Sequence, residues 1–153
     1  MAANKNQGTW ALNRAAALCS KREYCVRDVR EKLAIWEVSE MEADKIIDFL
    51  IQHKFIDEQR FARFYVNDKL KFNKWGKIKI ATMLKYKGID VCTIKTALSQ
   101  IDNNLYYDIC TALLRQKKKT SKQTDSAKAK NSLIRFGLGR GFEYAVVKEC
   151  MEN

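Results

Sequence analysis

Apolar residues recur every three or four positions along almost the whole chain, which is the spacing of one face of an α-helix. The widest of these faces lies in the centre of the chain and is formed by Phe61, Ala62, Tyr65, Val66 and Leu70. Narrower stripes occur within residues 12–19, 26–36, 43–50, 80–84, 91–101, 109–114, 129–136 and 142–151. The pattern predicts an all-α fold.

Residues that can cap helices stand beside several of these stripes. Ser39, with Glu42 three residues later, forms the pattern of a capping box, in which two side chains satisfy free backbone amides at the start of a helix. Asp57 and Asp90 are placed to accept hydrogen bonds from the first amides of the helices that follow them. Gly88 is typical of a helix C-terminus, where the backbone becomes left-handed.

One arrangement of a turn followed by apolar positions occurs three times. Apolar residues lie six and ten positions after Glu37, Gly88 and Gly141, and these turn positions are 51 and 53 residues apart. Such a period indicates one supersecondary unit used repeatedly. We therefore predict three tandem three-helix repeats that stack into an elongated, curved body. The predicted divisions are a flexible N-terminal tail at 1–8 and repeats at 9–53, 54–102 and 103–153.

Two residues depart from the repeat pattern. Glu37 stands where the later units have glycine, so the first turn is expected to close without a left-handed glycine. Gly137 stands where Leu33 and Leu84 anchor the earlier units. Glycine inside a helix costs about 1 kcal/mol relative to alanine, and we expect a packing defect in addition.

The composition agrees with a helical protein that has a core. Hydrophobic residues make up 46% of the 153 residues, prolines are absent, and only six glycines interrupt the chain. No apolar run reaches the roughly 20 residues of a membrane-spanning helix, and the N-terminus lacks the apolar core of a signal peptide. These features predict a cytoplasmic protein that does not contact a membrane.

The net charge of +11 is confined to the second part of the chain. Residues 1–60 contain ten basic and ten acidic residues, whereas residues 61–153 contain nineteen basic and eight acidic residues. Such asymmetry favours a polyanionic partner, with nucleic acid ahead of a membrane surface. A solvated face that only keeps the protein soluble is the alternative.

Residue types for catalysis or metal binding are sparse. The chain has one histidine, His53, and five cysteines without a CxxC pair, so we expect no metal site and reduced core thiols. Asp57 and Glu58 adjoin at a predicted helix start, where carboxylates serve as cap and dipole partner. Residues 137–141, GLGRG, lack the pattern of a phosphate-binding loop. We therefore expect neither a catalytic site nor a cofactor.

The candidate binding surface combines basic and aromatic residues. Seven lysines and no carboxylate lie between positions 69 and 87, and a second basic group ends the helix predicted at 105–120. Lysines beside aromatic rings suit a phosphate backbone, with stacking available where bases are exposed. The predicted partner- and DNA-binding residues are Lys69, Lys71, Lys74, Trp75, Lys77, Lys79, Lys85, Lys87, Arg115, Lys117, Lys118, Lys119, Lys122, Arg135 and Arg140.

Other roles for these residues stay open. Core packing is favoured for Tyr86 and is as well supported as a surface role for Trp75. Cations at 115–122 also stabilise a helix C-terminus through the helix dipole. A helix-turn-helix regulator or a protein-binding scaffold with solubilising lysines would fit the same composition. A regulator of that kind reads base edges with Arg, Asn or Gln, whereas the cations here are mostly lysine.

The central segment resembles a known family. The run FIDEQRFARFYV at 55–66, followed by KWGKIKIATMLKYKGID at 74–90, is similar to the central repeat of the RecX family. REYCVRDVREKL at 22–33 and RGFEYAVVKEC at 140–150 extend the resemblance over nearly the whole chain from about residue 10. RecX proteins modulate the RecA recombinase.

The resemblance implies a non-enzymatic protein of three tandem three-helix repeats, in agreement with the repeat spacing. It implies binding to the RecA filament along its helical groove, with inhibition of filament extension or promotion of disassembly. ATP hydrolysis and strand exchange would thereby be restrained. Some members of the family also bind DNA directly. We expect a monomer whose basic face contacts the RecA filament and single-stranded DNA, with double-stranded DNA as a further candidate partner.

Overall fold

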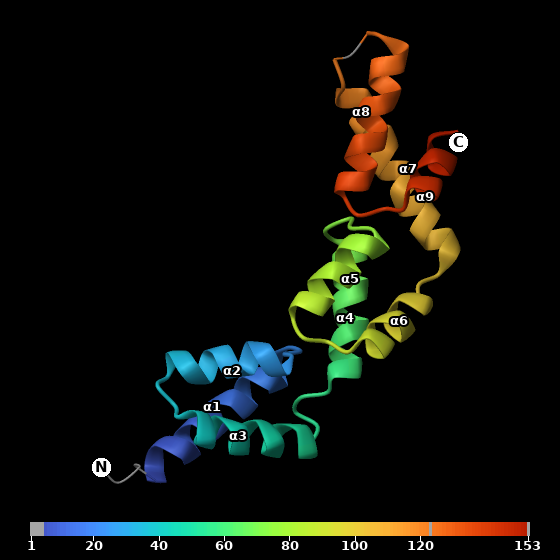
Figure 1. Ribbon diagram of the computed structural model, residues 1–153. Helices are drawn as coiled ribbons and strands as arrows, with labels where there is room; N and C mark the ends of the chain where they lie inside the picture. The colour runs from blue at the N-terminus through green and yellow to red at the C-terminus, as the bar shows by residue number, and fades with distance from the viewer. Residues whose placement is uncertain (1–4, 123, 153) are drawn as a thin grey trace.

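The computed structural model describes residues 5–122 and 124–152 (Figure 1). Within these residues the chain forms helices and no strand, which confirms the predicted all-α fold. The helices of this part of the chain are α1 (Lys5–Lys21), α2 (Val26–Ile35), α3 (Glu40–Gln52), α4 (Glu58–Lys71), α5 (Lys77–Tyr86), α6 (Val91–Ser99), α7 (Asn103–Thr120), α8 (Ser126–Gly139) and α9 (Tyr144–Met151).

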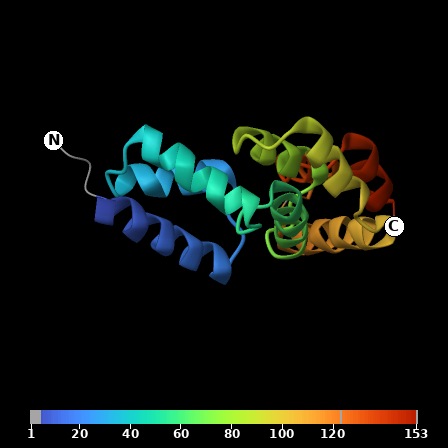
Figure 2. The same cartoon turned by 90° about the horizontal axis from the view of Figure 1, so that it is seen from below.

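The helices are grouped into three consecutive units that follow one another along an elongated body (Figure 1). The first repeat contains α1 to α3, the second α4 to α6, and the third α7 to α9. The helices of the first repeat lie across the long axis, whereas α4 and α8 lie nearly along it. Figure 2 shows the first repeat to one side of the other two, so the body bends at the junction of the first and second repeats.

The first helix begins at Lys5, four residues before the expected start of the first repeat at residue 9. Residues 5–8 therefore belong to α1, and the predicted tail was too long; residues 1–4 lie outside the described residues. A tertiary contact explains the difference. A Cβ added at Gly8 would lie 3.0 Å from Glu42 Oε2 of α3, so the polar first turns of α1 are supported by a neighbouring helix that the local sequence does not reveal.

The predicted N-cap side chains are in place, although of the capping box expected at Ser39 and Glu42 only the bond accepted by Ser39 forms among the described residues. Ser39 Oγ accepts a hydrogen bond from the Glu42 amide at 3.3 Å, and Asp57 Oδ1 accepts one from Arg60 at 3.0 Å. Asp90 Oδ2 accepts from Cys92 at 3.0 Å. Further aspartates cap the two long helices of the third repeat, as Asp102 accepts from Leu105 and Asp125 from Ala127. Each cap satisfies an amide that would otherwise lack a partner.

The three predicted turns have one common geometry. Gly88 and Gly141 adopt left-handed φ angles of 81° and 94°, and Glu37 adopts 62° at the equivalent place in the first repeat. In every repeat the residue after the turn donates its amide to a carbonyl five positions earlier. These bonds are Val38 to Leu33 at 2.9 Å, Ile89 to Leu84 at 3.1 Å and Phe142 to Gly137 at 3.1 Å. The first turn thus uses a left-handed glutamate where the others use glycine.

Replacement of Glu37 by glycine is expected to raise the free energy of unfolding by about 0.5–1 kcal/mol. The left-handed conformation costs an ordinary L-residue roughly 1–2 kcal/mol, and the extra freedom of glycine in the unfolded chain offsets part of the gain. Urea unfolding followed by circular dichroism measures the change. As a control, Glu31→Gly on the exposed face of α2 should destabilise by about 1 kcal/mol. An equal loss of unfolding free energy in both variants would contradict the assignment of a left-handed conformation to Glu37.

Buried apolar side chains form two clusters. One is confined to the first repeat and Ile56. The other runs through the second and third repeats, where Phe142 of the third repeat is fully buried together with Phe61, Ile80 and Leu84 of the second. The second and third repeats therefore share one core, to which Cys25 of the first repeat also belongs, whereas the other buried side chains of the first repeat form a cluster of their own with Ile56.

The packing defect expected at Gly137 is absent. Gly137 is buried in α8, and a Cβ at this position would lie 2.7 Å from Cγ2 and 2.9 Å from Cγ1 of Val147 in α9. Val147 thus fills the space beside Gly137. The glycine permits α8 and α9 to approach closely.

The cysteines agree only in part with the predicted core thiols. All are free; Cys19, Cys25, Cys110 and Cys150 are buried, whereas Cys92 lies exposed near the start of α6. Burial raises the pKa of the Cys25 thiol to about 11. A search of the described helices found none that is long and apolar enough to cross a membrane.

Candidate nucleic-acid interface

Five of the seven predicted lysines of the second repeat lie where α4 meets α5: Lys69, Lys71, Lys74, Lys77 and Lys79. We call this region the basic corner and define it as residues 69–79. Helix α4 ends at Lys71, Lys74 adopts a left-handed φ of 57°, and the Trp75 amide returns to the Lys69 carbonyl at 3.1 Å. Gly76 then begins α5. The corner is a tight turn closed by its own backbone.

Aromatic rings hold several of the lysine ammonium groups in place. The Nζ atoms of Lys69 and Lys79 lie 5.3 and 4.5 Å from the centre of the Trp75 ring. Lys77 Nζ lies 4.8 Å from the Tyr106 ring of α7. Distances below about 6 Å allow cation–π attraction. Trp75 is half-buried and lies beside these two cations.

The basic corner is fastened to the third repeat by backbone contacts. Gly76 donates its amide to the Arg140 carbonyl at 2.8 Å, and Ile78 donates to Gly141 at 3.0 Å. The Lys77 amide donates to Tyr106 Oη at 3.0 Å, and that hydroxyl donates to Glu143. These bonds use the amides of Gly76, Lys77 and Ile78, so three of the donors at the N-terminus of α5 are engaged within the protein.

Two predicted binding residues are instead engaged within the protein. The Arg140 guanidinium donates to the Asn73 carbonyl, and its Nε is buried without a partner among the described residues. Lys87 forms an ion pair with Asp28 of the first repeat at 3.0 Å. Both residues connect repeats, so we leave them out of the proposed surface. Their sequence positions, each beside a turn glycine, give no sign of these distant partners.

The remaining predicted residues are distributed along the second and third repeats. Lys71 and Lys85 are exposed at the C-terminal ends of α4 and α5. In the third repeat, Lys117 Nζ lies 5.2 Å from the Phe136 ring. The other cations of that repeat are exposed at the end of α7, in the following loop or on α8: Arg115, Lys118, Lys119, Lys122 and Arg135. Among the lysines of the predicted set, ion pairs within the described residues are limited to Lys69–Asp68 and Lys87–Asp28.

Two exposed aromatic residues change the expected picture. Tyr86 is 72% exposed, so the core role favoured for it was wrong. Its ring lies 5.6 Å from the Arg27 guanidinium of the first repeat. Phe72 is one of the aromatic residues interleaved with the lysines in the sequence, although it is not among the predicted binding residues, and it is 79% exposed at the basic corner. A sequence signal exists for Phe72, because it falls outside the apolar stripe that ends at Leu70.

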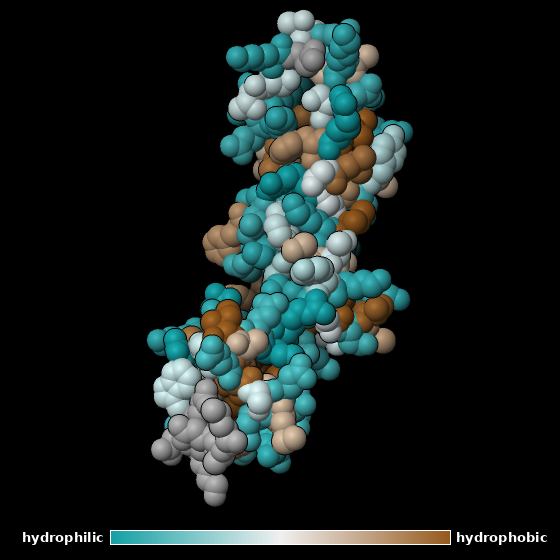
Figure 3. Space-filling model, turned by 60° about the vertical axis from the view of Figure 1, so that its left-hand side comes forward, coloured by the Kyte–Doolittle hydropathy of each residue, from teal (hydrophilic) through white to brown (hydrophobic). Residues whose placement is uncertain are grey.

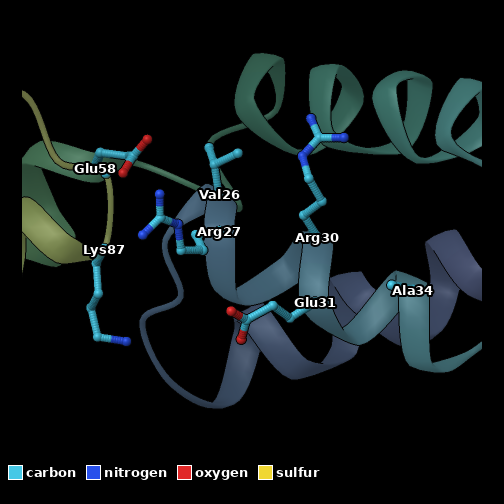
Figure 4. Close-up of a pocket in the computed structure, with 8 residues that line it drawn as sticks. Val26, Arg27, Arg30, Glu31, Ala34, Glu58 and Lys87 are labelled. Carbon is cyan, nitrogen blue, oxygen red and sulfur yellow. The ribbon is translucent and has the colours of Figure 1, made fainter.

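The first and second repeats meet through charged side chains around a cleft (Figure 4). Arg60 Nε of α4 pairs with Glu23 Oε1 at 2.6 Å, and Lys87 pairs with Asp28. Glu58 lies at the cleft with its Oε2 buried and unpartnered among the described residues. Burial, with a smaller contribution from Asp28, raises the pKa of the Glu58 carboxyl. Charged side chains predominate around the cleft, while the buried Cys25 of the first repeat packs into the shared core of the other two repeats.

Hydrophilic side chains predominate on the face shown in Figure 3, where apolar side chains appear only in separate patches. No group of three or more His, Cys, Asp or Glu side chains that could hold a metal ion occurs among the residues that the structure describes. The arrangement therefore presents cations and a few isolated aromatic rings to a partner.

Comparison with protein families gives three consecutive matches. Residues 11–50 match the first three-helix domain of RecX, residues 57–98 match the second, and residues 105–151 match the third. These ranges agree with the three helical units of the fold.

Named relatives show the same similarity. The chain is 30% identical over 148 residues to the regulatory protein RecX of Clostridium acetobutylicum, covering 94% of this chain and 68% of that protein. It is 31% identical to RecX of Chromobacterium violaceum, covering 90% and 86%. RecX of Clostridium botulinum strain Eklund 17B is 33% identical, and the match spans only 60% of its length.

Solved structures agree in fold. A crystal structure of regulatory protein RecX superimposes with a TM-score of 0.87 at 20% identity, covering 96% of this chain and 72% of that one. RecX from Lactobacillus salivarius gives a TM-score of 0.84 at 21% identity, covering 97% of both chains.

Proposed function

This chain belongs to the RecX family of regulatory proteins, and from this premise we propose that it binds the RecA filament on single-stranded DNA through the basic surface of its second and third repeats. Binding restrains the ATPase activity, extension and strand exchange of the filament. The protein acts in the cytoplasm as a monomeric, non-enzymatic regulator. The observation that carries this proposal is the confinement of the whole net charge of +11 to residues 61–153.

The shared core supports one continuous binding surface. Because the second and third repeats bury side chains in one cluster, their cations keep fixed relative positions. Tyr106, near the start of α7, contacts the basic corner, whereas Lys119 lies near the end of that helix. A rise of 1.5 Å per residue places these points about 20 Å apart. With about 3.4 Å per nucleotide along one strand, this distance corresponds to roughly six nucleotides.

The proposal predicts a lower RecA ATPase rate on single-stranded DNA when this protein is added at micromolar concentration. Strand exchange should fall in parallel, because both depend on the extended filament. The assay needs RecA and single-stranded DNA with and without the protein, plus the protein alone, which should hydrolyse no ATP. Unaltered ATPase activity and strand exchange would refute the proposed function.

A general nucleic-acid-binding role without RecA is the second candidate, and the exposed cations at the ends of α4 and α7 favour it equally. It predicts binding to DNA with no effect on RecA beyond competition for the strand. Phosphate contacts make log K fall by about 0.7 for each neutralised charge per tenfold increase in salt on single strands. A pure protein-binding scaffold would lack this dependence.

A further inference from the structure

Phe72 is the most exposed large apolar side chain among the described residues, with 79% of its surface accessible. It follows the last residue of α4 and forms the C-cap of that helix. Neighbouring rings at the basic corner are occupied: Trp75 is flanked by Lys69 and Lys79, and Tyr106 by Lys77. Among the described residues the Phe72 ring has no such cation or aromatic neighbour, so it is available to contact a partner.

The backbone beneath Phe72 is held from several sides. Its own amide donates to Asp68 at 2.9 Å, and Trp75 closes the turn on Lys69. Lys74 Nζ donates to the Lys71 carbonyl at 2.5 Å. From the third repeat, the Arg140 guanidinium donates to the carbonyl of the next residue, Asn73. The ring is therefore presented from a fixed corner, which lowers the entropy lost on binding.

The surroundings of the ring indicate the chemistry of its partner. Lys71 precedes Phe72 and Lys74 follows two residues later, while the ammonium groups of Lys69 and Lys79 are kept nearby on Trp75. The partner must offer regularly spaced negative charges together with flat apolar faces. Single-stranded nucleic acid offers both, because its phosphates alternate with unstacked bases. In a duplex the faces of the bases are covered by their neighbours.

We propose that Phe72 is a base-stacking platform that gives the basic corner a preference for single-stranded over double-stranded nucleic acid. This inference rests on the proposed function and names the element of the filament that the corner contacts. Stacking on an aromatic ring tolerates any base, so the preference is for strandedness and not for sequence. A contact of Phe72 with RecA itself is the competing possibility, and the experiment separates the two.

The test compares three variants in the absence of RecA: Phe72→Ala, Phe72→Tyr and Phe64→Ala. Phe64 is the matched control, because it is an exposed phenylalanine two turns earlier on α4 and outside the basic corner. Fluorescence anisotropy measures Kd for a labelled oligo-dT strand and for a duplex of equal length. Circular dichroism verifies that each variant is folded.

We expect Phe72→Ala to weaken single-strand binding by about 5- to 150-fold, the range found when a stacking residue is removed. Phe72→Ala should change duplex binding by less than about 2-fold. Phe72→Tyr keeps an aromatic face and Phe64 lies outside the basic corner, so both of these variants should bind the single strand like the parent. Equal effects on strand and duplex, or equal effects of Phe72→Ala and Phe64→Ala, would overturn the inference, as would a parent protein that does not bind the single strand. If Phe72→Ala binds DNA normally but no longer inhibits RecA ATPase, the ring contacts RecA. The inference then fails while the proposed function stands.

Discussion

Replacement of Gly76 by alanine is expected to lower the free energy of unfolding by about 3–5 kcal/mol. A Cβ at this position would lie 2.3 Å from the Phe142 amide nitrogen and 2.4 Å from the carbonyl carbon and oxygen of Gly141. These atoms are backbone, so they cannot move aside as a flexible side chain could. If the second and third repeats moved apart to relieve this clash, the hydrogen bonds that the Gly76 and Ile78 amides donate to the third repeat would also break.

The backbone of Gly76 isolates this steric effect. Its φ of −79° is one that alanine adopts readily, so no conformational strain is introduced. Gly139 is the matched control, because a Cβ added there has nothing within 4 Å. Gly139→Ala should be neutral or stabilise the protein by up to about 1 kcal/mol, since it lies within α8. Urea unfolding of both variants gives the comparison, and similar stabilities would show that the second and third repeats are not joined at Gly76.

Simultaneous replacement of Lys71, Lys118 and Lys119 by glutamate is expected to reduce affinity for single-stranded DNA about 100-fold or more. Each lost phosphate contact is worth about 1 kcal/mol in water, and the introduced carboxylates repel the strand. The slope of log K against log salt should become shallower by about 2, because three neutralised charges are lost. Filament inhibition should fall with DNA affinity. All three lysines are exposed, so the fold should persist.

The matched control replaces Lys21, Lys32 and Lys45 of the first repeat by glutamate, which reverses their charge in the same way. Lys21 and Lys32 also stand in the last turns of their helices, so the penalty against the helix dipole is comparable. The change in net charge is the same for both triple variants. If the control loses as much affinity, the effect comes from total charge, and the surface of the second and third repeats has no special role.

Most of the fold could be predicted from local sequence. Helical spacing of apolar residues identified the elements, and Ser39, Asp57 and Asp90 cap helices as predicted. Such signals are local, because a cap or a turn is decided by a few adjacent residues. Glu37 shows the limit: the repeat located the turn, but only the structure shows that the glutamate itself is left-handed.

The roles of individual residues in the candidate interface were less predictable. Arg140 and Lys87 look like any other cation in the sequence, yet their partners are 67 and 59 positions away. Tyr86 was expected in the core and is exposed, because α5 leaves this side of its last turn uncovered. Pairwise contacts over such separations depend on how repeats are placed against each other, and periodicity carries no information about that placement.

The sequence by itself determined that the chain is helical, that it contains three related units, and that the excess positive charge belongs to the second and third. These properties follow from periodicity, turn chemistry and composition, which act over short stretches of chain. Only the tertiary structure decided that the central lysine-rich stretch is a corner locked to the third repeat through Gly76, and that Phe72 is its free ring. The reason is that a contact between two backbone segments produces no recognisable pattern of residue types in the sequence. A glycine that ends a helix therefore cannot be distinguished in the sequence from a glycine that joins two repeats.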